Sequence, residues 1–177
     1  MPATVIMEAR APSVNAQLRT VSYAGAMSTG RIISAGKGRP LPYAGGYAHV
    51  VAEPVEGVEG FSAVELTVPA GSAGPVPHIH DGFDEAFFIL AGELALTCGD
   101  DAPIIAEAGA FCVAPRGERH TFANPSDTPA RFLCLWTPGR IGLDFFAAIG
   151  EAIPPNGCPD PAIMSALFEA HQTRAVP

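Results

Sequence analysis

Three histidines and one glutamate lie close together in this chain, and their spacing restricts what the chain can fold into. His78 and His80 are two residues apart, so on an extended strand both imidazoles point to the same face. The same alternation places Glu85 on one face with Phe87, and His120 begins another strand-like run. Four such side chains on the inward faces of different strands could converge inside a small β-barrel.

Three imidazoles and one carboxylate are a suitable ligand set for a single divalent metal ion. Imidazole binds several first-row transition metals, and a carboxylate shifts the preference toward harder ions. Iron, manganese or nickel is therefore expected, and zinc is also compatible. Buried together without a metal, these polar groups would be costly. The sequence thus predicts a metal site formed by His78, His80, Glu85 and His120.

Short strand-like runs separated by turns follow one another from residue 31 onward. The chain has 19 Gly and 18 Pro, which suit the turns of an all-β sandwich or barrel. The expected strands are Ile32–Ala35, Gly46–Glu53, Ser62–Val68, Val76–His80, Glu85–Leu90, Glu93–Thr97, Ile104–Glu107, Phe111–Ala114, His120–Ala123 and Arg131–Thr137.

The two ends of the chain differ from this strand-rich middle. Residues 1–26 are predicted to be an N-terminal extension, either an added edge strand or a segment that crosses to a partner subunit. Residues 27–140 are predicted to form the barrel, and residues 141–177 a C-terminal helical segment of the same domain. One helix is expected over Ile141–Glu151. Asp160 is expected to cap a second helix, with Pro161 in its first turn.

Composition and charge exclude several classes of protein. The chain is 48% hydrophobic and 16% charged, as in a compact globule. Its formal net charge is −8 and its basic residues are dispersed singly, which argues against nucleic-acid binding. We find neither an apolar run long enough to cross a membrane nor a signal peptide, so we expect a cytoplasmic protein. The four cysteines show no C-x-x-C spacing and are expected to be buried free thiols.

The two histidine-containing runs resemble the two sequence motifs of the cupin superfamily, and the chain resembles a single-domain member of that superfamily. The family's second motif, G-x5-P-x-G-x2-H-x3-N, matches at Gly109, Pro115, Gly117, His120 and Asn124. Its first motif, G-x5-H-x-H-x3,4-E-x6-G, matches from His78 to Gly92 but has Ser72 where the opening glycine is expected. The resemblance implies a double-stranded β-helix, also called a jelly-roll barrel.

The first motif also bears on which acid is the ligand. Counting from His80, both Asp84 and Glu85 are admissible, but only Glu85 leaves six residues before Gly92. Asp84 would then point away or support the ligands from outside. Cupins of this kind are commonly homodimers, so the resemblance also implies a homodimer.

The run from His78 to Gly92 is similar to small microbial cupins described as quercetinase-like. The resemblance implies a mononuclear metal-dependent dioxygenase that acts on a small enolic or phenolic substrate. In that chemistry Glu85 would be both metal ligand and proton acceptor. Two alternatives stay open: a non-oxidative metal-dependent isomerase, cyclase or lyase, and a protein that binds a small molecule without catalysis.

A further group of side chains could line a substrate pocket inside the barrel, although core packing is the better default for most of the aromatic ones and an outer or structural position is favoured for the histidine. These are His49, Phe87, Phe111, Phe122 and Trp136.

Overall fold

The computed structural model describes residues 20–22, 29–34, 36–43, 47–54, 60–154 and 159–177. It divides into two compact units, residues 1–35 and residues 36–177. In the first unit, β1 (Thr20–Ser22) pairs with β2 (Thr29–Arg31) in an antiparallel two-stranded sheet. Most of the predicted N-terminal extension lies outside the described residues. The boundary between the units falls later in the chain than the predicted one after residue 26.

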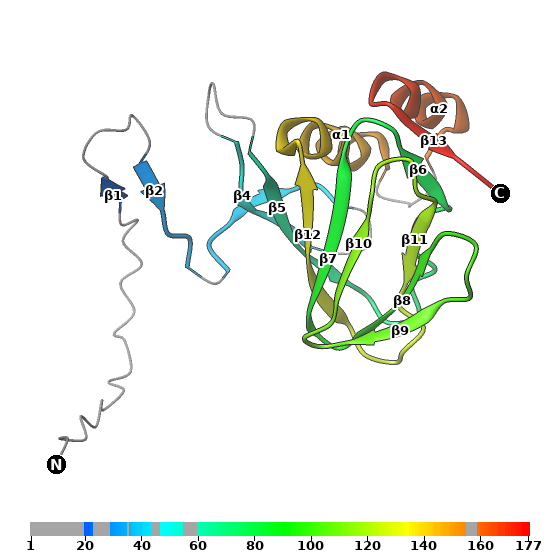
Figure 1. Ribbon diagram of the computed structural model, residues 1–177, viewed down its shortest axis with the longest axis horizontal. Helices are drawn as coiled ribbons and strands as arrows, with labels where there is room; N and C mark the ends of the chain where they lie inside the picture. The colour runs from blue at the N-terminus through cyan, green and yellow to red at the C-terminus, as the bar shows by residue number, and fades with distance from the viewer. Residues whose placement is uncertain (1–19, 23–28, 35, 44–46, 55–59, 155–158) are drawn as a thin grey trace, which may run out of the picture. The chain divides into compact units, whose positions relative to one another are not determined.

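The second unit is built from two antiparallel sheets that form a jelly-roll barrel (Figure 1). The six-stranded sheet has the order β10 (Phe111–Ala114), β7 (Asp84–Ala91), β12 (Ala130–Thr137), β5 (Ser62–Val68), β4 (Tyr47–Ala52) and β3 (Arg39–Leu41). The five-stranded sheet has the order β13 (Thr173–Ala175), β6 (His78–His80), β11 (His120–Ala123), β8 (Glu93–Cys98) and β9 (Ile104–Glu107). The prediction of an all-β barrel followed by helices is confirmed.

One predicted strand is wrong. Residues 32–34 belong to no strand, and the run falls between β2 and β3. Ile32 and Ile33 are exposed, so neither side chain gains the burial that would favour an extended segment within a sheet. The apolar composition of this run misled the prediction.

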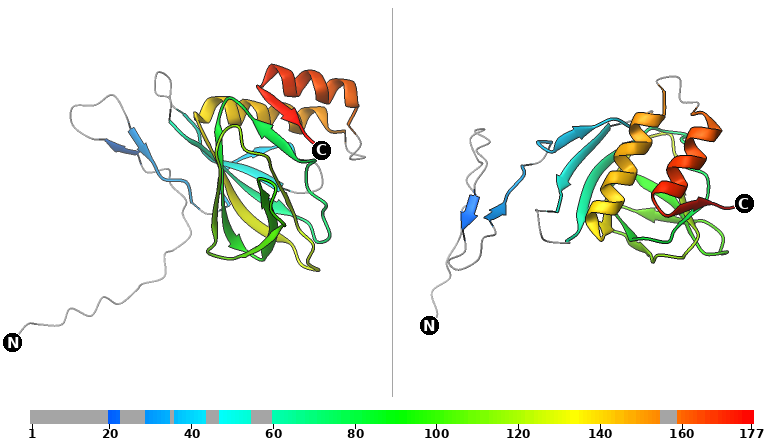
Figure 2. Two further views of the ribbon diagram at one scale, coloured as in Figure 1. Left: turned by 45° about the vertical axis from the view of Figure 1, so that its right-hand side comes forward. Right: turned by 90° about the horizontal axis from the view of Figure 1, so that it is seen from above.

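Two helices cover one side of the barrel and lie side by side in Figure 2. Helix α1 (Gly139–Ala152) packs on β12 and β5, and α2 (Pro161–Ala170) packs on α1 and β13. Asp160 caps α2 as predicted, because its Oδ1 accepts a hydrogen bond of 2.8 Å from the amide of Ala162. No helix in the described part of the chain has the length and apolarity needed to span a membrane.

Close approach of α1 to the sheet depends on glycine. A Cβ at Gly142 would lie 2.3 Å from Cβ of Trp136, and one at Gly139 would lie 2.3 Å from the backbone nitrogen of Ser62. Real side chains do not tolerate such distances. The two glycines therefore let the helix lie directly on the strands and close one wall of the barrel.

Alternating burial along the strands places the core between the two sheets. On β7, Glu85, Phe87 and Ile89 are buried, while their neighbours Asp84, Ala86 and Phe88 are only partly buried. This two-residue period is what a strand with one face inside the barrel requires. It is also what brings polar side chains from both sheets to one interior site.

Candidate metal centre

Four buried side chains from three strands meet in the interior of the barrel. His78 and His80 come from β6, Glu85 from β7 and His120 from β11. One ligand atom from each residue lies within 4.8 Å of the others. The structure thus brings together all four residues that the sequence predicted as ligands, and they could hold a metal ion.

Strand pairing and one turn bring the two sequence motifs together. In the register of β6 and β11, His120 stands opposite His78. The turn before β11 contains Gly117, whose φ of +83° favours glycine and whose amide donates a hydrogen bond of 2.8 Å to the carbonyl of His80. The second motif is therefore tied to the first through the backbone as well as the side chains.

Hydrogen bonds at Nδ1 orient the histidine rings. Nδ1 of His78 lies 2.9 Å from the carbonyl oxygen of Val76, and Nδ1 of His120 lies 3.0 Å from that of Glu118. Because a carbonyl oxygen can only accept, each Nδ1 must carry the hydrogen. Nε2 of these rings is then left to bind a metal, the arrangement that outer partners produce in metal sites.

The third ring is held from two sides. Nδ1 of His80 lies 2.8 Å from Oγ1 of Thr173, a buried residue on β13. The ring of Phe83 stacks on the His80 imidazole with a centroid separation of 4.1 Å. Strand β13 therefore contributes directly to the site, a role that the sequence did not reveal.

The carboxylate of Glu85 lies against two of the imidazoles. Its Oε2 is 2.8 Å from Nε2 of His120 and 3.1 Å from Nε2 of His80. Two bare nitrogen lone pairs would repel a carboxylate oxygen at these distances, so a positive species must lie among them, either a proton or a metal ion. The donor set and its spacing fit a divalent metal.

The pKa shifts of three of these residues are consistent with a positive charge next to the Glu85 carboxylate. Burial alone would raise the pKa of Glu85, but hydrogen bonds from His120 and His80 outweigh it and hold the pKa well below its usual range. Burial opposes a higher pKa at His120, yet the hydrogen bond to Glu85 raises it above the ordinary value. Burial, reinforced by His120, lowers the pKa of His78 to about 4, so this ring is neutral at pH 7.

The second oxygen of Glu85 faces β12. Its Oε1 accepts a hydrogen bond of 2.7 Å from Sγ of Cys134 and one of 3.1 Å from Nε1 of Trp136. Burial and the charge of Glu85 raise the pKa of the Cys134 thiol well above its usual value, so the thiol keeps its hydrogen and can donate it. The sequence indicated no role for Cys134. The alternation Cys134–x–Trp136, at the parity of the core residues of β12, is the signal that could have found it.

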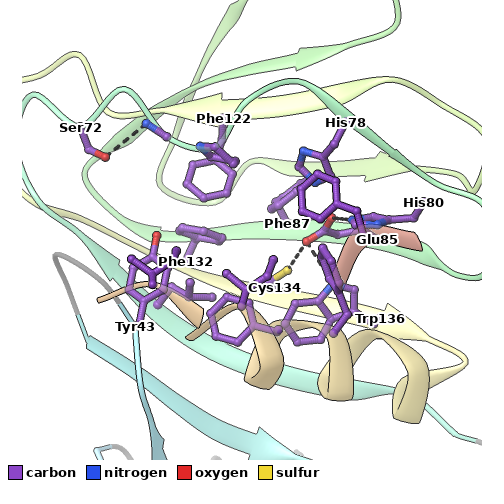
Figure 3. A pocket seen from close by; sticks show the side chains of 18 residues that line it. Tyr43, Ser72, His78, His80, Glu85, Phe87, Phe122, Phe132, Cys134 and Trp136 are labelled. Atoms are coloured by element: carbon purple, nitrogen blue, oxygen red, sulfur yellow. Dashed lines mark hydrogen bonds and ion pairs between the residues drawn. The ribbon is translucent and has the colours of Figure 1, made fainter. Parts of the chain in front are cut away.

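A cavity of about 270 Å³ opens beside the cluster, and His78, His80 and Glu85 are among its lining residues (Figure 3). Eight of its 18 lining residues are Phe, Tyr or Trp: Tyr43, Phe87, Phe122, Phe132, Trp136, Phe145, Phe146 and Phe168. In Figure 3, Ser72 and Tyr43 lie at one end of the pocket and His78 and His80 at the other. Helices α1 and α2 thus supply part of the wall, through Phe145, Phe146 and Phe168.

Two of the residues considered as possible pocket lining are not among the residues that line the cavity. Phe111 is 60% exposed on β10, where it pairs with Phe88 on the outward face of the sheet. His49 lies on β4 between the buried Ala48 and Val50, and its side chain therefore points away from the interior. Phe87, Phe122 and Trp136, three of the other residues considered as possible lining, do line the cavity.

Asp84 and Asn124 are engaged outside the ligand cluster. Asp84 forms an ion pair with Arg116, with 2.8 Å between Oδ2 and Nη2, and accepts a further bond from the Arg116 amide. Asn124 is fully buried, and its Nδ2 donates to the carbonyls of Val68, Pro69 and Thr128. The last residue of the second motif therefore fixes a turn.

Comparison with known proteins agrees with this architecture. Residues 64–136 match the family described as "Cupin domain". No curated protein matches the chain.

Several solved structures share the fold at low identity. The cupin domain of Cnp3 from Schizosaccharomyces pombe is 14% identical, with a TM-score of 0.53 over 68% of this chain and 85% of that one. The polyketide cyclase RemF from Streptomyces resistomycificus is 19% identical, with a TM-score of 0.52 over 60% and 78% of the two chains. An RmlC-like cupin from Shewanella frigidimarina is 17% identical, with a TM-score of 0.52 over 63% and 94%. The family match identifies a cupin domain over residues 64–136 of this chain, and these solved structures share its fold.

Proposed function

We propose that this protein is a mononuclear metal-dependent dioxygenase that acts on a small, uncharged enolic or phenolic substrate. One observation carries the proposal: three of the four clustered residues, His78, His80 and Glu85, line a cavity rich in aromatic side chains. Among the described residues that line this cavity, Glu85 is the one acidic side chain, and none is Lys or Arg. A ligand pocket of this kind takes its affinity from apolar contact and its orientation from a few polar groups.

The charge of the cavity bears on the substrate class. Away from a metal held by the four ligands, a carboxylate or phosphate buried there would meet no Lys or Arg in the described wall, and an unpaired buried charge is strongly unfavourable. A flat conjugated molecule would instead pack against the rings of Phe122 and Phe132, whose centroids are 5.2 Å apart. A hydroxyl or enol oxygen of such a molecule would point toward the histidines.

His78, His80, Glu85 and His120 would hold the metal, which supplies a Lewis acid and a centre at which dioxygen can react. The remaining steps belong to the chain. The aromatic wall excludes water and orients the substrate, and Glu85 would accept the proton that the substrate hydroxyl loses.

The hydrogen bonds on Glu85 bear on its part in this scheme. Both oxygens of its carboxylate are engaged, Oε2 by the imidazoles and Oε1 by Cys134 and Trp136. Hydrogen bonds to the charged form lower the basicity of a carboxylate. The geometry therefore supports Glu85 as a ligand more strongly than as a base, and the two roles need separate tests.

The deciding experiment is oxygen uptake during turnover. Protein purified without chelator is analysed for metal, then supplied with a flavonol or an enolised β-diketone in a sealed oxygen-electrode cell. Substrate loss with stoichiometric oxygen uptake supports the proposal. Substrate loss without oxygen uptake contradicts it and assigns the protein to the isomerase or cyclase class. Binding of these compounds without any turnover contradicts it in favour of a binding protein.

A further inference from the structure

The carboxylate of Glu85 is held from the side opposite the histidines. Its Oε1 accepts hydrogen bonds from Cys134 and Trp136, and neither of these side chains was expected to touch a ligand. All three residues are buried, with exposed fractions of 7% for Glu85, 3% for Cys134 and 2% for Trp136. Each contact therefore lies where water does not compete with it.

Strand register creates this contact. In the pairing of β12 with β7, Trp136 stands opposite Glu85 and Cys134 stands opposite Phe87. Cys134 and Trp136 are two residues apart and share the inward face of β12. The two donors consequently reach the same oxygen from adjacent inward positions of one strand.

The indole of Trp136 is itself fixed in place. Helix α1 has Gly142 where any side chain would collide with Trp136, at 2.3 Å from its Cβ and Cγ. On α1, Phe146 also packs against the indole, with ring centroids 5.4 Å apart. Because the ring is confined on this side, its N–H group has a set direction, and that direction is toward Oε1 of Glu85.

We infer that Cys134 and Trp136 are positioning residues that make Glu85 a one-oxygen ligand. By engaging Oε1, they turn Oε2 toward His80 and His120 and keep the carboxylate from chelating the metal through both oxygens. The coordination position that a second carboxylate oxygen would occupy is thereby left open toward the cavity. This inference rests on the metal site of the proposed function, but it does not depend on which reaction that site performs.

Cobalt(II) is the probe for the test, because its visible absorption responds to coordination number and its affinity can be measured by competition with a chromophoric chelator. Four variants are compared with wild type: Trp136→Phe, Cys134→Ala, Cys134→Ser and the double variant Trp136→Phe with Cys134→Ala. Cys112→Ala is the matched control, since this half-buried thiol contacts Cys98 and not Glu85. Thermal unfolding of the metal-free proteins measures the purely structural effect of each change.

Loss of an outer partner of a metal ligand typically weakens metal binding by about 10- to 100-fold. We expect a loss in this range for Trp136→Phe, a larger loss for the double variant, and an altered cobalt spectrum in both. Cys134→Ala should alter the cobalt spectrum. Cys134→Ser keeps a hydrogen-bond donor at this position and should show the wild-type spectrum. Cys112→Ala should bind cobalt as wild type does.

Three outcomes are distinguishable. If wild type binds no cobalt at this site, the proposed metal site itself fails. If wild type binds cobalt and the double variant matches it in affinity and spectrum, the inference about Cys134 and Trp136 is overturned while the metal site stands. If the double variant only unfolds at a lower temperature and its cobalt spectrum is unchanged, the two side chains are structural and the inference is likewise overturned.

Discussion

The two faces of strand β7 carry similar side chains in very different surroundings. On the inner face, Glu85 is buried and accepts hydrogen bonds from four side chains, and Phe87 is 1% exposed. On the outer face, Asp84 pairs with the half-exposed Arg116, and Phe88 contacts a Phe111 that is 60% exposed. Neighbouring residues of the same chemical type thus have opposite surroundings.

The comparison shows that residue type alone does not identify a functional site. A carboxylate in water interacts weakly with its partner, because solvent screens the charges and the side chains lose freedom when they pair. A carboxylate inside the barrel must have its charge balanced and its lone pairs filled. Position on the inward face, and not the presence of an acid, therefore marks Glu85 as a candidate ligand.

The largest expected effect lies on the inner face. Replacing His80 or His120 with Ala removes a ligand, and metal content should fall sharply from about one ion per chain, because fewer than four donors then remain. Metal analysis of each purified variant measures the loss, and circular dichroism verifies that the barrel still forms. Full metal retention in both variants would refute the ligand assignment.

The two neighbouring acids provide the second test. If Glu85 accepts the substrate proton, Glu85→Gln should lower turnover by about a hundred- to ten-thousand-fold while the protein still binds metal and substrate. Asp84→Asn should leave metal content and turnover close to wild type, since Asp84 faces Arg116 and not the cavity. Wild-type rates in metal-loaded Glu85→Gln would remove the base role and leave Glu85 as a ligand only.

Substitution of two phenylalanines compares the inner and outer faces of the sheet by the loss of unfolding free energy. Phe87→Ala empties a buried position against Phe122 and Phe132, and such changes cost about 3 to 5 kcal/mol of unfolding free energy. Phe111→Ala removes a largely exposed ring and should change stability by about 0.5 kcal/mol. Denaturant unfolding of the metal-free variants gives both values. Equal losses would mean that the outer ring is buried in solution.

The fold and the ligand cluster could be predicted because both follow from local patterns. Two-residue alternation fixed which side chains face inward, and the spacing of His78, His80 and His120 matched a known motif. The same pattern failed at Phe111, because β10 is an edge strand with four residues whose apolar side chains partly face solvent. Alternation identifies the two faces of a strand, but it does not say which of them is covered.

Contacts between distant segments that no motif marks could not be predicted. Thr173 reaches His80 only because β13 joins the edge of the five-stranded sheet, and Trp136 reaches Glu85 only through the register of β12 with β7. Tyr43 and Phe168 both line the cavity, although they lie near opposite ends of the sequence of the barrel unit. Each of these depends on tertiary packing, which a single sequence leaves open.

The smallest expected effect is on the outer face. Arg116→Gln removes the ion pair with Asp84 but keeps the hydrogen bond from the backbone amide of residue 116 to Asp84. The change should therefore lower the unfolding temperature only slightly, and by less at high salt.

The same ion pair predicts a pH dependence of stability. Hydrogen bonds from Arg116 lower the pKa of Asp84 to about 2, below its ordinary value of 3.8. A carboxyl whose folded pKa is depressed stabilises the protein above its unfolded pKa and loses that contribution as the pH falls toward the folded one. The difference between wild type and Arg116→Gln should therefore be constant near neutral pH and shrink below about pH 4, as thermal unfolding at a series of pH values would show. A difference that grows on acidification would mean that Asp84 is not the partner that stabilises this surface.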